Sequence, residues 1–212
     1  MKPQNQMEDF KTMNEKTELV IIIDRSGSMH GLEGDVIGGF NSLIEKQTQE
    51  GDTVVTTIFF NDEFSLIHEN VDIKEIKPLD KRNYVPTGCT ALLDAIGNAI
   101  GLVKAKHAKL TEKELPKHTI FSIMTDGLEN ASKEYSYKKI KSMIELQKKC
   151  GWDFIFQAAN IDTKYEANRL GIDADMAVSF DANSEGVVKN MKRMCCMISA
   201  KRKEPKKTNK KG

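Results

Sequence analysis

The pattern of apolar and polar positions predicts strands that alternate with helices. Runs rich in β-branched and aromatic residues at 19–23, 52–60, 119–125 and 152–159 are typical of strands. The runs at 19–23 and 119–125 are apolar enough to be buried on both faces, as in the middle of a parallel sheet. A short strand is expected at 176–180, and residues 64–71 follow an Asn-Asp turn as an antiparallel return strand.

Between these strands, apolar residues recur at the spacing of helices. This spacing predicts helices over 32–48, from Thr90 through about 103, around 140–144, up to Leu170, and over 187–200. The lysine-rich residues 104–117 are expected to form a solvated connector. Alternating strands and helices predict an α/β protein: a Rossmann-like, doubly wound, mostly parallel six-stranded sheet, with one antiparallel edge strand and helices on both faces.

Length and charge suggest one folded unit with two polar ends. The chain has 212 residues and a net charge of +1, and we expect a polar lead at 1–17, a domain at 18–200 and a basic, disordered tail at 201–212. The tail holds seven basic residues and one acidic residue. Nucleic-acid binding through this tail therefore remains an alternative, although no aromatic or helical pattern accompanies the charges.

The sequence also favours a cytoplasmic location and no membrane association. No apolar run approaches the roughly 20 residues that span a bilayer, and the first residues lack the apolar segment of a signal peptide. The cysteines show no spacing typical of a zinc site or a disulfide framework, so we expect reduced, mostly buried thiols. They are Cys89, Cys150, Cys195 and Cys196.

Candidate chemistry begins where the first buried strand ends. The run at 19–23 is followed at once by Asp24-x-Ser26-x-Ser28, with Gly27 in the turn. In open α/β sheets, ligands bind outside the carboxyl ends of the strands. One carboxylate and two hydroxyls are hard oxygen donors, which suit Mg²⁺ or Mn²⁺ better than zinc or copper.

Two further segments carry oxygen donors to the same edge of the predicted sheet. Thr90 opens a helix in the sequence Thr-Gly-Cys-Thr, and Asp126 follows the buried strand 119–125. The first and fourth strands can be neighbours at the switch point of a doubly wound sheet, so Asp24 and Asp126 are expected side by side. Each piece alone fits an ordinary helix cap or turn, whereas all of them together predict a metal site.

The sequences DRSGSM, TGCT and MTDG together resemble the von Willebrand factor type A domain, with its metal-ion-dependent adhesion site. The resemblance covers about 18–200, and FIFQAANID is similar to stand-alone bacterial and phage members. It implies that Ser26 and Ser28 bind the metal directly and that Asp24 acts mostly through a water. It also implies direct binding by Thr90 in the ligand-engaged state, and binding by Asp126 directly or through water.

The resemblance implies a non-enzymatic, metal-dependent protein-binding module. Neutral hydroxyls leave a divalent cation under-neutralised, so an open coordination position should attract an Asp or Glu carboxylate from a partner protein. The alternative is a Mg²⁺-dependent hydrolase or phosphotransferase. Against it, no nucleophile with an adjacent histidine and no phosphate-cradling glycine loop is visible, and Ser26 stands where a dehalogenase-like pattern needs a second carboxylate.

Overall fold

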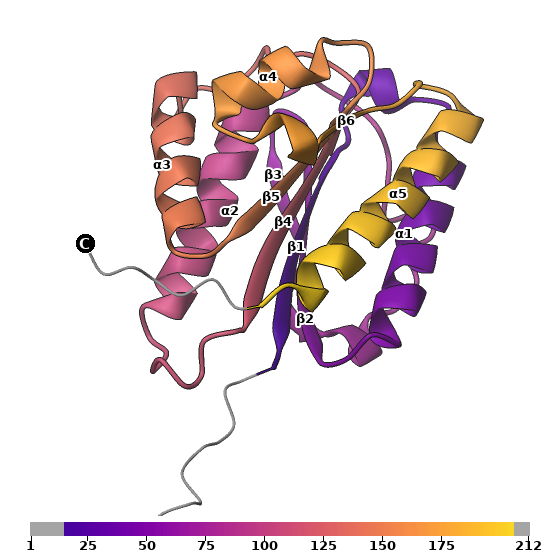
Figure 1. Ribbon diagram of the computed structural model, residues 1–212. Coiled ribbons are helices and arrows are strands. Elements are labelled where there is room, and N and C mark those ends of the chain that lie inside the picture. The colour runs from indigo at the N-terminus through magenta and orange to yellow at the C-terminus, as the bar shows by residue number, and fades with distance from the viewer. Residues whose placement is uncertain (1–14, 206–212) are drawn as a thin grey trace, which may run out of the picture.

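The computed structural model describes residues 15–205 and contains one six-stranded sheet (Figure 1). The strand order is β3-β2-β1-β4-β5-β6, and every neighbouring pair is parallel except β2 with β3. The strands are β1 Thr17–Asp24, β2 Thr53–Phe60, β3 Phe64–Asp72, β4 His118–Thr125, β5 Asp153–Ala158 and β6 Ala177–Ser179. The predicted doubly wound sheet with one antiparallel edge strand is confirmed.

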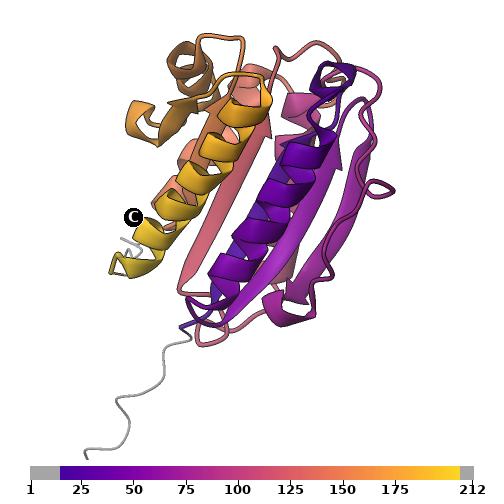
Figure 2. The same cartoon turned by 90° about the vertical axis from the view of Figure 1, so that its right-hand side faces the viewer.

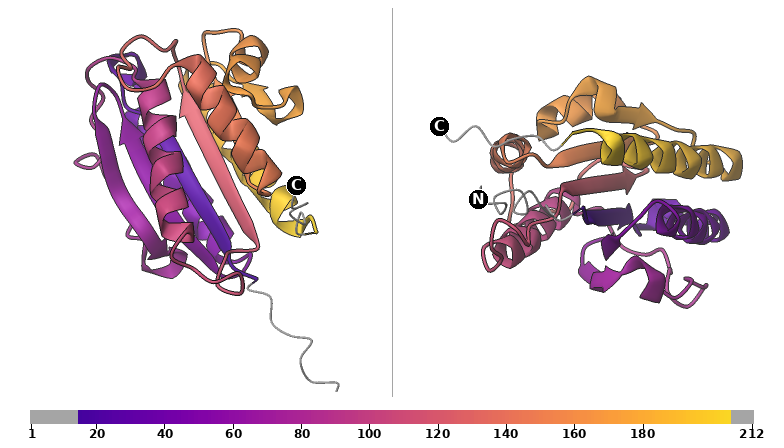
Figure 3. Two further views of the ribbon diagram at one scale, coloured as in Figure 1. Left: turned by 90° about the vertical axis from the view of Figure 1, so that its left-hand side faces the viewer. Right: turned by 60° about the horizontal axis from the view of Figure 1, so that its bottom comes forward.

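Helices cover both faces of the sheet. Figure 2 shows α1 and α5 side by side on one face, and Figure 3 shows α2 and α3 on the other. Each face has its own apolar core, and residues of α4 join the core beneath α2 and α3. The helices are α1 Glu33–Thr48, α2 Leu92–His107, α3 Tyr137–Lys149, α4 Thr163–Leu170 and α5 Ser184–Lys203, with short 3₁₀ turns η1 Gly27–Met29, η2 Ile73–Glu75 and η3 Ala174–Met176.

Strand β1 lies in the middle of the sheet, and all eight of its residues are buried. Its alternate side chains enter the two cores, so Leu19, Ile21 and Ile23 face α1 and α5, whereas Val20 and Ile22 face α2. A strand that is buried on both faces has no reason to alternate polar and apolar residues, which explains its continuous apolar run. The parallel neighbours β1 and β4 end at the same edge of the sheet and place Asp24 beside the end of β4.

Several boundaries differ from those expected. Helix α2 continues to His107, because the lysine-rich stretch that we expected to be solvated supplies charges to a buried carboxylate of β1. Helix α5 begins at Ser184, where the Asn183 side chain accepts the backbone N–H of Gly186. This helix ends at Lys203, so 201–203, which we assigned to the tail, are helical. Residues 1–14 of the predicted lead and 206–212 of the tail lie outside the described residues.

The expectation of mostly buried thiols is wrong. Cys195 is buried in the core beneath α5, but Cys89, Cys150 and Cys196 are exposed. They lie in a loop, at a helix end and on the outer side of α5, where no apolar neighbours cover them. Within the described part of the chain, none of the helices is both long and apolar enough to cross a membrane.

Candidate metal centre

Asp24 is the fully buried centre of the site. One of its carboxylate oxygens, Oδ1, accepts the backbone N–H of Ser26 at 2.7 Å, which closes the turn that follows β1. The other, Oδ2, accepts the hydroxyl of Thr125, the last residue of β4, at 2.6 Å. The carboxylate therefore fixes its own loop and also ties the end of β1 to the end of β4.

The two serine hydroxyls continue this network toward Asp126. The Oγ atoms of Ser26 and Ser28 are 3.0 Å apart, and Ser28 Oγ donates to Asp126 Oδ1 at 2.6 Å. Ser28 lies in η1, the short turn that brings its hydroxyl back over the strand ends. The structure thus gathers four of the five predicted metal ligands, Asp24, Ser26, Ser28 and Asp126, at one edge of the sheet.

Thr90, the fifth predicted ligand, lies in the loop that precedes α2 and is 3 % exposed. Its backbone N–H donates to the Asn130 side chain at 2.9 Å, and its carbonyl accepts the Asn130 N–H at 3.0 Å. No hydrogen bond among residues 15–205 joins the Thr90 hydroxyl to the other four groups. The helix cap is Ala91 rather than Thr90, so the buried hydroxyl is not used to cap α2.

A glycine holds this loop against the loop after β1. Gly27 donates its N–H to the carbonyl of Gly88 at 3.0 Å. Gly88 has a φ of +75°, and a Cβ built there would lie 1.8 Å from Asp62 Oδ1, which accepts the N–H of Cys89. Only glycine fits this conformation and this close approach, so the Thr-Gly-Cys-Thr sequence has a steric reason.

The electrostatics of the site are those of two buried carboxylates without a counter-charge. Burial raises the pKa of Asp24, and the charge of Asp126 raises it further, although hydrogen bonds from Thr125 and Ser26 oppose the shift. Burial also raises the pKa of Asp126, against a hydrogen bond from Ser28. Neither carboxylate forms an ion pair with a basic side chain among residues 15–205. A cation bound between them would offset both the burial and the mutual repulsion.

The donor set fits a hard divalent cation. Two carboxylates and three hydroxyls supply oxygen atoms only, as Mg²⁺ and Mn²⁺ prefer. Within the described range, no group of three or more His, Cys, Asp or Glu side chains could hold a metal ion. A metal site in this part of the chain therefore needs ligands of other kinds as well, and the hydroxyls of Ser26, Ser28 and Thr90 are such ligands.

Sequence reasoning missed three supporting groups. Tyr84, in the loop before Thr90, donates its hydroxyl to the Asp24 carbonyl at 2.5 Å, and nothing in the polar loop around it indicated this contact. Thr125 was assigned to the strand, and its position directly before Asp126 was the available signal. Nothing in the sequence around Asn130 indicated that it would bind the Thr90 backbone. His30, which we did not assign as a ligand, pairs with Glu33 and has an 83 % exposed side chain.

Comparison with known proteins gives matches at the level of structure. At the level of sequence, neither the known protein families nor the curated proteins give a match. The structure is similar to the von Willebrand factor domain of the pili tip protein Mfa5 from Porphyromonas gingivalis, with a TM-score of 0.62 and 11 % identity over 91 % of this chain and 98 % of that one. It is also similar to manganese-loaded TRAP from Plasmodium vivax, with a TM-score of 0.58 and 18 % identity over 87 % and 75 % of the two chains.

A third similar structure is proximal thread matrix protein 1 from the mussel byssus with a zinc-occupied MIDAS motif, at a TM-score of 0.60 and 14 % identity. The match covers 89 % of this chain and 47 % of that one, so the chain spans about half the length of the mussel protein. These likenesses, together with the strand order, show that the chain has the fold of a von Willebrand factor type A domain.

Proposed function

We propose that this chain is a non-enzymatic, divalent-metal-dependent protein-binding module. Asp24, Ser26, Ser28, Thr90 and Asp126 would hold one Mg²⁺ or Mn²⁺ at the carboxyl edge of the sheet. The observation that carries the proposal is the pair of buried carboxylates, Asp24 and Asp126. They are linked through the backbone N–H of Ser26 and the hydroxyls of the two serines, and they have no basic partner among the described residues.

The same donor set explains why such an ion would recruit a partner. Two carboxylates and neutral hydroxyls leave the coordination of a divalent cation open to a further anionic oxygen, and an Asp or Glu of another protein supplies one. The zinc-occupied MIDAS motif of the mussel protein and the manganese-loaded TRAP support a divalent ion as a ligand of this fold.

The hydrogen bonds of the site give no support to the alternative of a hydrolase. None of the hydrogen bonds in residues 15–205 joins a histidine to Ser26, Ser28 or Thr90, so no hydroxyl has the imidazole base that activates a serine nucleophile. Of the similar structures, the mussel protein is named a thread matrix protein and Mfa5 a pili tip protein, names that fit a binding role.

The first test is calorimetric titration of the purified chain with MnCl₂ and MgCl₂. We expect one site with a Kd on the order of 10⁻⁴–10⁻³ M. The variant Ser26→Ala/Ser28→Ala should lose this binding. The matched control, Ser42→Ala/Ser142→Ala, removes two exposed helix hydroxyls away from the site and should keep it. Unchanged binding in the first variant would rule this site out.

The second test identifies the partner protein. Affinity capture from the native cell is run with Mg²⁺ and with EDTA, using wild type and the variant Asp24→Ala. A true partner is retained only by wild type with Mg²⁺, and its retention is lost when one of its own Asp or Glu residues is changed to Asn or Gln. Equal retention with EDTA would exclude a metal bridge.

A further inference from the structure

Two exposed aliphatic side chains lie beside the candidate metal centre. Of the seven large apolar side chains exposed among residues 15–205, only one is more exposed than Leu128, at 57 %, and Val85, at 56 %. Leu128 comes two residues after Asp126. Val85 comes directly after Tyr84, whose hydroxyl donates to the carbonyl of Asp24. Single exposed apolar side chains need no explanation, but two beside one candidate site indicate a contact surface.

Leu128 belongs to a loop that is held in place by its own polar side chains. The carboxylate of the next residue, Glu129, accepts four hydrogen bonds, three from within the loop and one from the first turn of α2. Asn130 is bound twice to the backbone of Thr90. The loop is therefore fixed to the candidate metal centre, and the exposure of Leu128 does not come from a loosely held chain.

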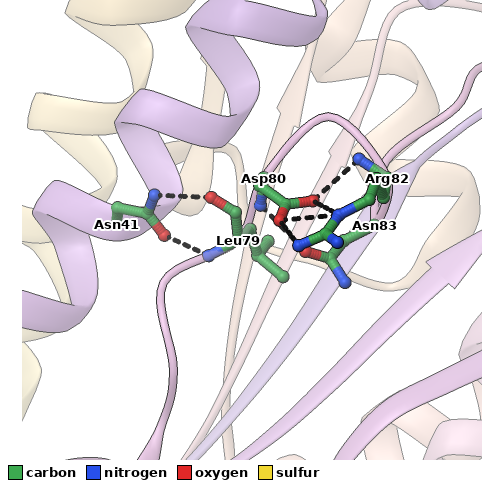
Figure 4. A network of polar contacts seen from close by, with 5 residues as sticks. All are labelled: Asn41, Leu79, Asp80, Arg82 and Asn83. Carbon is green, nitrogen blue, oxygen red and sulfur yellow. Dashed lines mark hydrogen bonds and ion pairs between the residues drawn. The ribbon is translucent and has the colours of Figure 1, made fainter.

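The segment that carries Val85 is held on both sides of this residue. Figure 4 shows the part that precedes it, where the side chain of Asn41 in α1 donates to the carbonyl of Leu79 at 3.0 Å and accepts its N–H at 2.8 Å. Two residues after Val85, the N–H of Thr87 donates to the carbonyl of Arg25 at 2.9 Å. Val85 is therefore fixed beside the loop that follows β1.

The two residues belong to loops on opposite sides of the end of β1. A carbonyl of the segment with Val85 accepts the side-chain N–H of Asn61, directly after β2, at 2.9 Å. Leu128 follows β4, and β2 and β4 are the two neighbours of β1 in the sheet. Between these loops, Ser28 is exposed and can be reached from solution. A segment that binds over Ser28 therefore has an aliphatic side chain of this protein to each side.

We propose that Leu128 and Val85 determine the specificity of this site, which prefers a partner segment whose Asp or Glu is flanked by large apolar side chains. The inference rests on the proposed function, because the acidic residue binds through the cation. Apolar flanks cover Leu128 and Val85, and this burial should raise the affinity about tenfold. Since both loops are already fixed, binding needs little further ordering of either one. Polar flanks leave both side chains in water and gain nothing.

The test is binding of the full chain, with MnCl₂ and with EDTA, to synthetic peptides that carry Leu-Glu-Leu, Ser-Glu-Ser or Leu-Gln-Leu in one glycine-serine frame. With metal, wild type should bind the Leu-Glu-Leu peptide about tenfold more tightly than the Ser-Glu-Ser peptide, and the glutamine peptide least. Leu128→Ser/Val85→Ser should bind the two glutamate peptides equally. The control Leu146→Ser removes a comparably exposed leucine of α3 and should keep the preference.

Calorimetry with MnCl₂ on the same proteins separates this inference from the proposed function and shows that the metal site of each variant is formed. If glutamate peptides bind only with metal but wild type does not distinguish their flanks, the inference is overturned and the proposed function stands. A preference that persists in the double variant, or that is equally strong with EDTA, also overturns the inference. If Mn²⁺ does not bind, or the glutamate and glutamine peptides bind equally, the proposed function fails and the inference fails with it.

Discussion

Strand β1 carries two fully buried carboxylates, Glu18 near its amino end and Asp24 at its carboxyl end, and their surroundings are opposite. Glu18 forms ion pairs with Lys106 and, at 2.5 Å, with Nε2 of His107, both from the last turn of α2. Asp24 accepts hydrogen bonds from Thr125 and from the Ser26 backbone, and has no basic partner among residues 15–205.

The pKa values follow this difference. Burial alone would raise the pKa of Glu18, but the hydrogen bond from His107 and the charge of Lys106 outweigh it and lower the pKa. At Asp24 burial prevails and the pKa is raised. The fold neutralises one end of β1 with its own side chains, whereas at the other end the cation that we propose would have to come from solution.

The largest effect should come from removing the internal cation. Lys106→Met leaves Glu18 buried with only His107 beside it, and we expect the free energy of unfolding to fall by about 3 kcal/mol. Lys104→Met, an exposed change two residues earlier in α2, serves as the control and should cost little. Urea denaturation of the two variants measures the difference.

The double variant Glu18→Gln/Lys106→Met sharpens this test. It removes both charges, so part of the lost stability should return, because no unpaired charge is left in the core. Equal losses in Lys104→Met and Lys106→Met would mean that the ion pair at the amino end of β1 contributes nothing measurable.

The next effect is the gain from an external cation. At a Mg²⁺ concentration of 100 times the Kd, the free energy of unfolding should rise by about 2.7 kcal/mol. Asp126→Asn should reduce this rise, and without metal it should stabilise the protein by roughly 1 kcal/mol, since a repulsion between buried charges is removed. Thermal melts with and without Mg²⁺ measure both changes. A metal-free Asp126→Asn protein much less stable than wild type would contradict the repulsion.

A smaller effect is expected in the dependence of stability on pH. The pKa of Glu18 is lowered from 4.5, so its contribution is fully present above pH 4.5 and is lost as the pH falls through the folded-state pKa. The free energy of unfolding of Glu18→Gln should therefore fall less steeply in acid than that of wild type. The two slopes should differ by at most about 1.4 kcal/mol per pH unit. Denaturation at several pH values checks this, with the exposed Glu112→Gln as a control that keeps the wild-type slope.

The smallest effect concerns the support of Asp24. Tyr84→Phe keeps the buried ring and removes only the hydroxyl that donates to the Asp24 carbonyl, which should cost about 1 kcal/mol of unfolding free energy. Tyr165→Phe, at a 64 % exposed ring, should cost nothing measurable. If the two variants are equally stable, the hydrogen bond from Tyr84 to the end of β1 is dispensable.

The sequence predicted the fold wherever one local pattern decided it. The continuous apolar run before Asp24 marked β1 as central, and the similar run before Asp126 placed β4 beside it. The Asn-Asp turn after Phe60 marked the single antiparallel pair. The gathering of Asp24, Ser26, Ser28 and Asp126 then followed from strand ends that meet at one edge of the sheet.

What the sequence did not predict depends on contacts between distant residues. Tyr84 lies in a polar loop, and its role exists only because this loop returns to a strand sixty residues earlier. We predicted that Lys106 and His107 belong to a solvated connector, because the carboxylate that they neutralise is far away in the sequence. The exposed cysteines were misjudged since burial is decided by the packing of whole helices, which local composition does not report.

The hydrogen bond from Thr125 to Asp24 has a consequence for the order of events during folding. It joins residues 101 positions apart, and Ser28 and Asp126 are 98 apart. Pairing β1 with β2 closes a much shorter loop than pairing β1 with β4, and contacts of long sequence separation carry the larger entropic cost and slow folding. The edge that carries Asp24 and Asp126 is therefore incomplete until the long loop has closed, and its completion reports that β1 and β4 have paired.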